Sequence, residues 1–242
     1  MAAATEDWSR PAFEPGGGDA SLFYLAFGEL ALVRLPPTPG GVSLTVHPQG
    51  ESRLWVDALV AAARDDAEDS PGLATVVRGV PDFAVLRGHR VDPPDLVHLR
   101  DAESMLAALL EAGAVALLDV EAQRWWTPDA FRSEVLATLR PAVRAHVSVR
   151  ARRGMVEARG LRKVGRPDLR LHRVPAGSEA RAADLCWGLA ERLVRGARPG
   201  PGFSAGVLRL RPSGDAGHPA LEAEWPDAPP PPSGARDLVR PT

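Results

Sequence analysis

Lysine, cysteine and long apolar runs are all scarce in this chain of 242 residues. The one cysteine, Cys186, cannot form an internal disulfide, so the sequence does not indicate an oxidising compartment. Because Cys186 lies in an apolar stretch with no base nearby, we interpret it as a buried, inert thiol. The longest apolar runs, such as 112–118, are much shorter than the roughly 20 residues that a membrane-spanning helix needs.

The first twenty residues lack the basic leader and apolar core of a secretory signal, so we expect a cytoplasmic protein. Hydrophobic residues make up 45% of the chain and charged residues 25%, as in ordinary globular proteins. Lys163 is the only lysine, and every other basic side chain except histidine is arginine. Since a GC-rich coding sequence produces the same bias, arginine counts alone do not indicate a phosphate-binding protein.

Both ends of the chain are rich in proline or glycine and carry few large apolar side chains. Residues 1–20 include three consecutive glycines, and residues 226–242 include four consecutive prolines. Such segments bury too little apolar surface to offset the entropy of ordering them, so we expect both to be disordered. The folded body then spans 21–225, either as one domain or as two subdomains, 21–100 and 101–225.

Within that body, the patterns predict strands and helices in irregular alternation. The apolar run from Ser21 to Leu35 predicts a buried strand, and the β-branched run from Leu73 to Arg78 predicts another. Leucines at helical spacing after Ser178 predict a long helix that ends at Gly196. We therefore predict an α+β fold, with a mixed, mainly antiparallel sheet and about four packed helices.

The segment 143–174 has the clearest pattern in the sequence. Apolar residues alternate with Arg144, His146, Ser148 and Arg150 before the turn at Gly154, and alternation returns from Val156 and again from Leu169. This pattern predicts strands with an aliphatic face in the core and a cationic face in water. Residues 140–173 hold eleven basic side chains but only two acidic ones, a local charge of +9 in a chain of net charge −2.

The stretch 155–169 resembles a pattern found in uncharacterised bacterial α+β domains. In those domains a strand runs into a turn of the type Gly-Leu-x-Lys-Phe-Gly-Arg-Pro-Asp-Leu and then into another strand. The segment 113–131, a strand followed by Trp-Trp and a helix that begins with Thr-Pro, resembles the same kind of domain. The resemblance covers about 95–225 and departs at Val164, where an aromatic residue is more usual. It implies a fold type and no reaction.

The turn at 160–168 is the first candidate site. Its two glycines permit positive φ and Pro167 stiffens the return, so Arg162, Lys163 and Arg166 are predicted to project from a rigid connection. A stiff basic turn could bind a phosphate or a carboxylate. Alternatively, the turn only shapes a strand crossover, and Asp168 pairs with Arg166 or caps backbone amides.

Trp125 and Trp126 form the second candidate site. Adjacent residues of an extended segment point to opposite sides, so one of the two rings could be exposed as an anchor for a partner protein. Alternatively, both rings pack under neighbouring loops. His146 and His172 are both predicted on outward strand faces, where they could be neighbours. No histidines have metal-ligand spacing, and the sequence lacks Walker-type and Gly-x-Gly-x-x-Gly signatures, so we assign no catalytic residue, metal or cofactor.

These observations favour a non-enzymatic protein that binds another protein. An accessory role in bacterial toxin–immunity or secretion systems is one form of this hypothesis, suggested by association with similar orphan domains. The first alternative is an anion or nucleic-acid binder that uses the basic face of 140–173, although no stacking aromatics interleave with its arginines. The second alternative is an enzyme with dispersed catalytic residues, for which His146 or His172 would have to share a pocket with a perturbed carboxylate.

Overall fold

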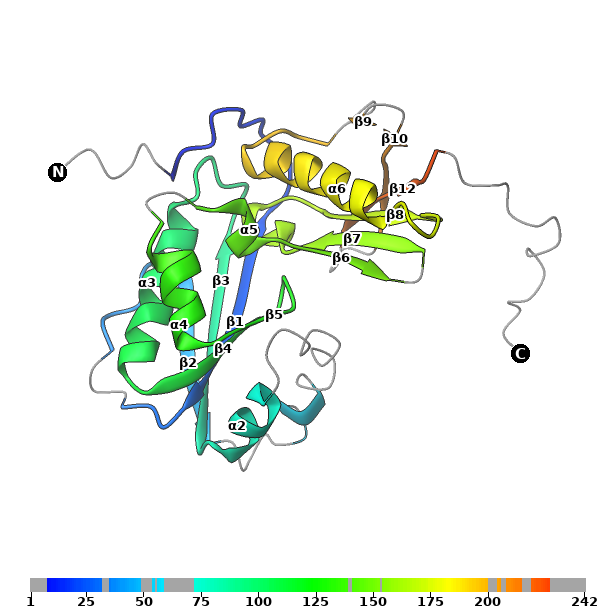
Figure 1. The fold of residues 1–242 in the computed structure, drawn as a ribbon. Helices are drawn as coiled ribbons and strands as arrows, with labels where there is room; N and C mark the ends of the chain where they lie inside the picture. Colours follow the sequence, from blue (N-terminus) through cyan, green and yellow to red (C-terminus); the bar gives the residue numbers. More distant parts are fainter. Residues whose placement is uncertain are drawn as a thin grey trace, which may run out of the picture.

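A computed structural model gives the fold, and it describes residues 8–31, 35–48, 54, 56–58, 72–138, 141–152, 154–199, 204–205, 208–214 and 219–226. Two five-stranded sheets and the helices packed on them make up the described chain (Figure 1). The predicted α+β class and the mainly antiparallel pairing are confirmed. The strands form two sheets, whereas the prediction named a single one. The C-terminal segment 227–242, part of the predicted tail, lies outside the described residues.

The first sheet has the strand order β2-β3-β1-β4-β5, and all of its neighbours are antiparallel. Its strands are β1 (Ala20–Gly28), β2 (Val42–Pro48), β3 (Asp82–Arg90), β4 (Ala114–Asp119) and β5 (Arg124–Trp126). Successive side chains of a strand point to opposite faces. In β1, Leu22 and Tyr24 therefore face one apolar cluster, whereas Leu25 and Phe27 face another.

The second sheet has the order β11-β12-β8-β7-β6, and only its pair β12·β8 is parallel. Its strands are β6 (Ser148–Arg152), β7 (Met155–Arg159), β8 (Asp168–His172), β11 (Arg211–Ser213) and β12 (Ala220–Glu224). A separate short pair joins β9 (Ser204–Ala205) to β10 (Leu208–Arg209). The prediction of an aliphatic face is confirmed for β7 and β8, where Val156, Ala158, Leu169 and Leu171 are fully buried.

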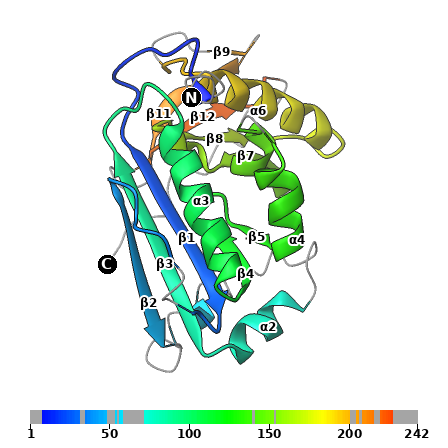
Figure 2. The same ribbon diagram turned by 90° about the vertical axis from the view of Figure 1, so that its left-hand side faces the viewer.

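The longer helices cover one face of each sheet, and a short helix packs on the opposite face of the first sheet. The longest are α3 (Val97–Glu111), which lies across the first sheet with α4 (Pro128–Phe131), and α6 (Glu179–Val194), which covers the second sheet (Figures 1 and 2). The shorter ones are α2 (Leu73–Gly79), the π-helical turn η4 (Arg132–Leu136), α5 (Val143–His146) and the 3₁₀ turn η5 (Leu161–Val164). The side chains under α3, α4 and α6 form one continuous core cluster that joins both sheets.

Two local predictions are wrong. Residues 73–79 form the helix α2 instead of a strand, because Val77 packs into the second face of the first sheet and that contact outweighs β-branched propensity. Residues 143–146 form the helix α5, so the outward strand face predicted for this segment begins only at Ser148. Ala145 and His146 are both buried. In a strand with one solvent-exposed face, two adjacent side chains would point to opposite faces, and one of them would be exposed.

The N-terminal segment 8–19, which we predicted to be disordered, is fixed against the body. Trp8 is buried in the core, and its carbonyl accepts a hydrogen bond from the Leu96 amide at 2.8 Å. The Ala12 amide donates to the Arg195 carbonyl at 3.0 Å. No local pattern predicted these contacts, because each partner lies far along the chain.

Candidate functional site

The turn at 160–168 is built on two residues with left-handed backbone. Gly160 has φ of 97° and Gly165 has φ of 66°, and η5 lies between them. A β-carbon on Gly160 would lie 2.4 Å from the His146 carbonyl oxygen, and one on Gly165 would lie 2.3 Å from the Gly18 carbonyl oxygen. Both positions therefore require glycine for space as well as for conformation. The turn thus fits closely between α5 and the N-terminal segment.

Lys163 points into the protein instead of outward. Its side chain is completely buried, and its Nζ forms an ion pair with Oδ2 of Asp119 at the end of β4. Nζ also lies 5.4 Å from the centre of the Tyr24 ring, and the Lys163 carbonyl lies 2.8 Å from Nε2 of His98. The lysine therefore ties η5 to the first sheet, and it does not present its charge to a ligand.

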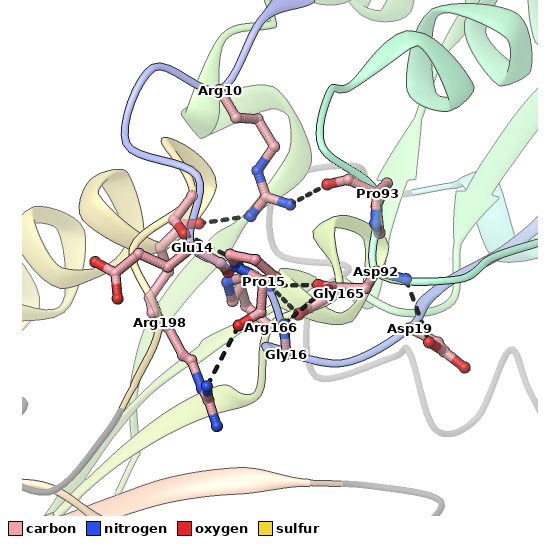
Figure 3. A network of polar contacts seen from close by, with 12 residues as sticks. Arg10, Glu14, Pro15, Gly16, Asp19, Asp92, Pro93, Gly165, Arg166 and Arg198 are labelled. Carbon is pink, nitrogen blue, oxygen red and sulfur yellow. Dashed lines mark hydrogen bonds and ion pairs between the residues drawn. The ribbon is translucent and has the colours of Figure 1, made fainter.

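Arg166 is also buried, and backbone carbonyls surround its guanidinium group (Figure 3). Its Nε donates to the backbone carbonyl oxygen of Ala197 at 2.9 Å. Its Nη2 donates to the backbone carbonyl oxygens of Glu14 at 3.0 Å and of Gly196 at 2.8 Å. Its Nη1 donates to the carbonyl of Gly165 at 2.8 Å and lies 3.5 Å from Oδ1 of Asp92. Arg166 thus joins the N-terminal segment, the end of α6 and η5, and it does not pair with Asp168 as one reading of the sequence expected.

Asp168 caps a backbone amide of the turn, which is one of the alternatives predicted from the sequence. Its Oδ1 accepts a hydrogen bond from the Leu161 amide at 3.0 Å. Burial raises the pKa of Asp168 to about 7, although the Leu161 amide and the Arg159 guanidinium both oppose the rise. The carboxyl group is therefore only partly ionised at neutral pH.

Arg162 lines both surface cavities beside the turn with a partly exposed side chain, whereas Arg166 lines only one of them and is buried. Nη1 of Arg162 lies 3.3 Å from Oε2 of Glu121, and 21% of the arginine side chain and 11% of the glutamate side chain are exposed. Burial raises the pKa of Glu121 above its ordinary value, although Arg162 opposes the rise. The predicted anion site of Arg162, Lys163 and Arg166 is therefore reduced to Arg162, which already has a carboxylate partner.

Two adjoining cavities with volumes of about 630 and 520 Å³ share Ser21, His89 and Arg162, and together they form what we call the inter-sheet groove. The larger cavity lies over β1, β3 and the start of β2, and it is lined by Ser21, Leu22, Phe23, Gly41, Val42, Ser43, Arg87, Gly88, His89, Glu121 and Arg162. The smaller cavity continues past Pro167 to β11 and β12 of the second sheet. The groove thus connects the two sheets.

The groove combines an aromatic floor with charged walls. Phe23 lies under the guanidinium group of Arg87, whose Cζ is 4.8 Å from the ring centre. Arg87 and His89 are exposed, and Nε2 of His89 lies 3.3 Å from Oδ2 of Asp19. Sequence reasoning missed Ser21, Arg87, His89 and Glu121 as a group, because they come from three separate segments and carry no motif.

The outer face of the second sheet is not uniformly cationic. In one row across the strands, arginines alternate with glutamates, and the register neighbours are Arg150, Glu157, Arg170, Glu222 and Arg211. Nη1 of Arg170 lies 3.2 Å from Oε1 of Glu222. The predicted cationic face is therefore wrong in this row, because Glu157 of β7 and Glu222 of β12, the latter from outside the basic segment, lie between the arginines.

The two tryptophans occupy opposite faces of β5, as the alternation of an extended segment predicts. Trp126 is buried in the main core, with its ring centre 5.9 Å from that of Phe131. Trp125 is partly exposed and packs against Phe27 on the other face, at 5.7 Å between ring centres. Both rings therefore contribute to packing, and Trp125 keeps some accessible surface.

His146 and His172 contact different carboxylates. Nε2 of His146 lies 3.1 Å from Oε1 of Glu103 inside the protein, without hydrogen-bond geometry. Nε2 of His172 lies 3.6 Å from Oε2 of Glu222 on the outer face of the second sheet. Neither histidine lines either cavity of the groove. The enzymatic alternative required His146 or His172 to share a pocket with a perturbed carboxylate, and this groove does not meet that requirement.

Among the described residues, no three His, Cys, Asp or Glu side chains are grouped so that they could hold a metal ion. No helix in the same part of the chain is long and apolar enough to cross a membrane. Comparison with protein-family models, curated proteins and solved structures found no match to this chain.

Proposed function

We propose that this protein is a non-enzymatic binding protein whose inter-sheet groove receives an extended segment of another protein. The observation that carries the proposal is the continuity of the groove, since two cavities of about 630 and 520 Å³ share three lining residues. A single small ligand commonly occupies about 300–1,000 Å³ of a compact pocket. A groove that runs on from one sheet to the next suits a peptide segment better.

The surface chemistry of the groove supports the same proposal. Exposed backbone glycines, hydroxyl groups and a phenylalanine ring line the larger cavity, together with two arginines. Arginine and aromatic side chains are enriched at protein interfaces. The alternating charges on the second sheet give less support to nucleic-acid binding, because cross-strand glutamates partner arginines that would otherwise face phosphate groups.

The test is capture of a partner from native lysate with a variant that fills the groove. Ser43 lines the larger cavity and is exposed, so Ser43→Trp places a large ring in the groove with little effect on the core. Ser133→Trp is the matched control, because Ser133 is exposed on η4 and lines neither cavity. We expect mass spectrometry to identify a protein that wild type and Ser133→Trp both retain and that Ser43→Trp loses. Equal retention by all three would contradict the proposal.

A further inference from the structure

The Arg162–Glu121 pair differs from the other ion pairs made by the turn at 160–168. Lys163 and Arg166 are fully buried, and groups of the protein surround their charges. Arg162 and Glu121 instead meet at 3.3 Å on the wall of the groove, where both are partly accessible. A ligand in the groove can therefore compete for this pair.

Glu121 is a carboxylate in a position that disfavours its charge. Arg162 and Lys163 of η5 and the Ser21 hydroxyl on β1 stabilise the ionised form, whereas burial and Asp119 on β4 oppose it. Arg87 and His89 on β3 line the same cavity, and Asp168 on β8 is electrostatically coupled to Glu121. Burial has the largest effect, so the charged form of Glu121 is held less firmly than that of an exposed glutamate.

Arg87 supplies a second cation in the same cavity. Its guanidinium group lies over the Phe23 ring, with 4.8 Å between Cζ and the ring centre. A guanidinium group that stacks on a ring keeps its N–H donors directed outward in its own plane. Arg87 and Arg162 both line this cavity, and their guanidinium groups offer charge-assisted hydrogen bonds to carboxylates.

We propose that the partner segment in the groove is acidic, and that one of its carboxylates replaces Glu121 on Arg162 while Arg87 binds a second one. This inference rests on the proposed function, and it names the chemistry of the partner. Glu121 then acts as a resident competitor that occupies Arg162 until the segment arrives. Since one carboxylate is exchanged for another, specificity comes from the second contact at Arg87 and from the aromatic floor.

The exchange has a defined dependence on pH. Protonation removes the charge of Glu121 and weakens its hold on Arg162, so an acidic segment binds more tightly as pH falls through the pKa of Glu121. The trend reverses only where the carboxylates of the segment themselves become protonated, near pH 4.

The probe is the pentapeptide Glu-Leu-Glu-Leu-Glu with blocked ends. The neutral comparison peptide has Gln in place of each Glu. Binding is measured by nuclear magnetic resonance titration at pH 5.5 and 7.5 with the full chain. For wild type we expect the acidic peptide to bind about tenfold more tightly than the neutral one. Glu121→Gln should bind the acidic peptide more tightly than wild type at pH 7.5, and its affinity should change less between the two pH values than that of wild type. Arg87→Gln and Arg162→Gln should each weaken binding about tenfold.

Arg132→Gln is the matched control, because Arg132 is an exposed arginine of η4 outside both cavities. The affinity of this variant for the acidic peptide should equal that of wild type. The measurement at two pH values on wild type needs no variant, so it tests the inference even if a variant fails to fold. Equal affinity for the two peptides, or no effect of Glu121→Gln, would overturn the inference. If Ser43→Trp still abolishes partner capture in that case, the proposed function stands and only the acidic partner is wrong.

Discussion

Lys163 and Arg166 show how two basic residues of one short turn can serve the fold instead of a ligand. Lys163 neutralises Asp119, and Arg166 satisfies backbone carbonyls that would otherwise be buried without donors. A buried ion pair contributes little net stability when intact, but the loss of one partner is costly because the other charge remains buried.

The first prediction concerns Lys163. Lys163→Met should lower the free energy of unfolding by about 3–5 kcal/mol, because Asp119 is left without a counter-charge. Adding Asp119→Asn should restore part of the loss, because the amide oxygen can still accept the hydrogen bond from Ala122. Denaturant unfolding of the single and double variants measures both effects. A double variant no more stable than Lys163→Met would contradict the pairing.

The second prediction concerns Asp168, whose pKa rises from an ordinary 3.8 to about 7 on folding. An acid with a raised folded-state pKa binds its proton more tightly when folded, so its charging lowers stability as pH rises from about 4 to about 7. Asp168→Asn keeps an oxygen for the Leu161 amide and removes the charge. Its free energy of unfolding should exceed that of wild type at pH 8, by up to about 4 kcal/mol. The gain should disappear near pH 4, and a constant difference across this range would be incompatible with the raised pKa.

At the scale of elements, β5 shows how one short strand serves two cores. Its register against β4 places Trp126 opposite Leu117 and Trp125 opposite Leu118, and these leucines belong to different apolar clusters. The strand therefore links the cluster under α3 and α6 to the cluster under α2.

The third prediction compares the two tryptophans of this strand. Trp126→Ala should destabilise the protein by about 3–5 kcal/mol, as expected for a large ring lost from a packed core. Trp125→Ala should cost clearly less, because its ring is partly exposed. Thermal unfolding of the two variants under identical conditions tests the ranking, which would fail if Trp125→Ala were the more damaging change.

For the whole molecule, the segment 8–19 connects parts that are distant in the sequence. The Phe13 ring contacts two guanidinium groups, with its centre 5.4 Å from Cζ of Arg10 and 5.7 Å from Cζ of Arg166. Arg10 donates to the carbonyls of Leu193, Val194 and Pro93, so it joins α6 to the loop after β3 (Figure 3). Burial and the neighbouring Arg166 lower the pKa of Arg10 to about 10.

The fourth prediction tests this connection with Arg166→Lys. Lysine keeps the charge but cannot reproduce the planar group of N–H donors that reaches four separate carbonyls. Hydrogen exchange at the Ala12 and Glu14 amides, which are bonded to the end of α6, should accelerate at least tenfold in the variant. Exchange at amides of β7 serves as the internal control, and unchanged exchange in the N-terminal segment would show that Arg166 does not hold it.

The sequence by itself determined the α+β class, the aliphatic faces of β7 and β8, and the helix that follows Ser178, because these depend on periodicity between near neighbours. It also identified the turn at 160–168, whose glycines are needed in the structure. The direction of each charged side chain was decided only by the tertiary structure. Lys163 is 44 positions from Asp119, and Arg166 is 152 positions from Glu14. Burial of such charges depends on a partner that no local pattern specifies, and the groove arises from the same long-range packing.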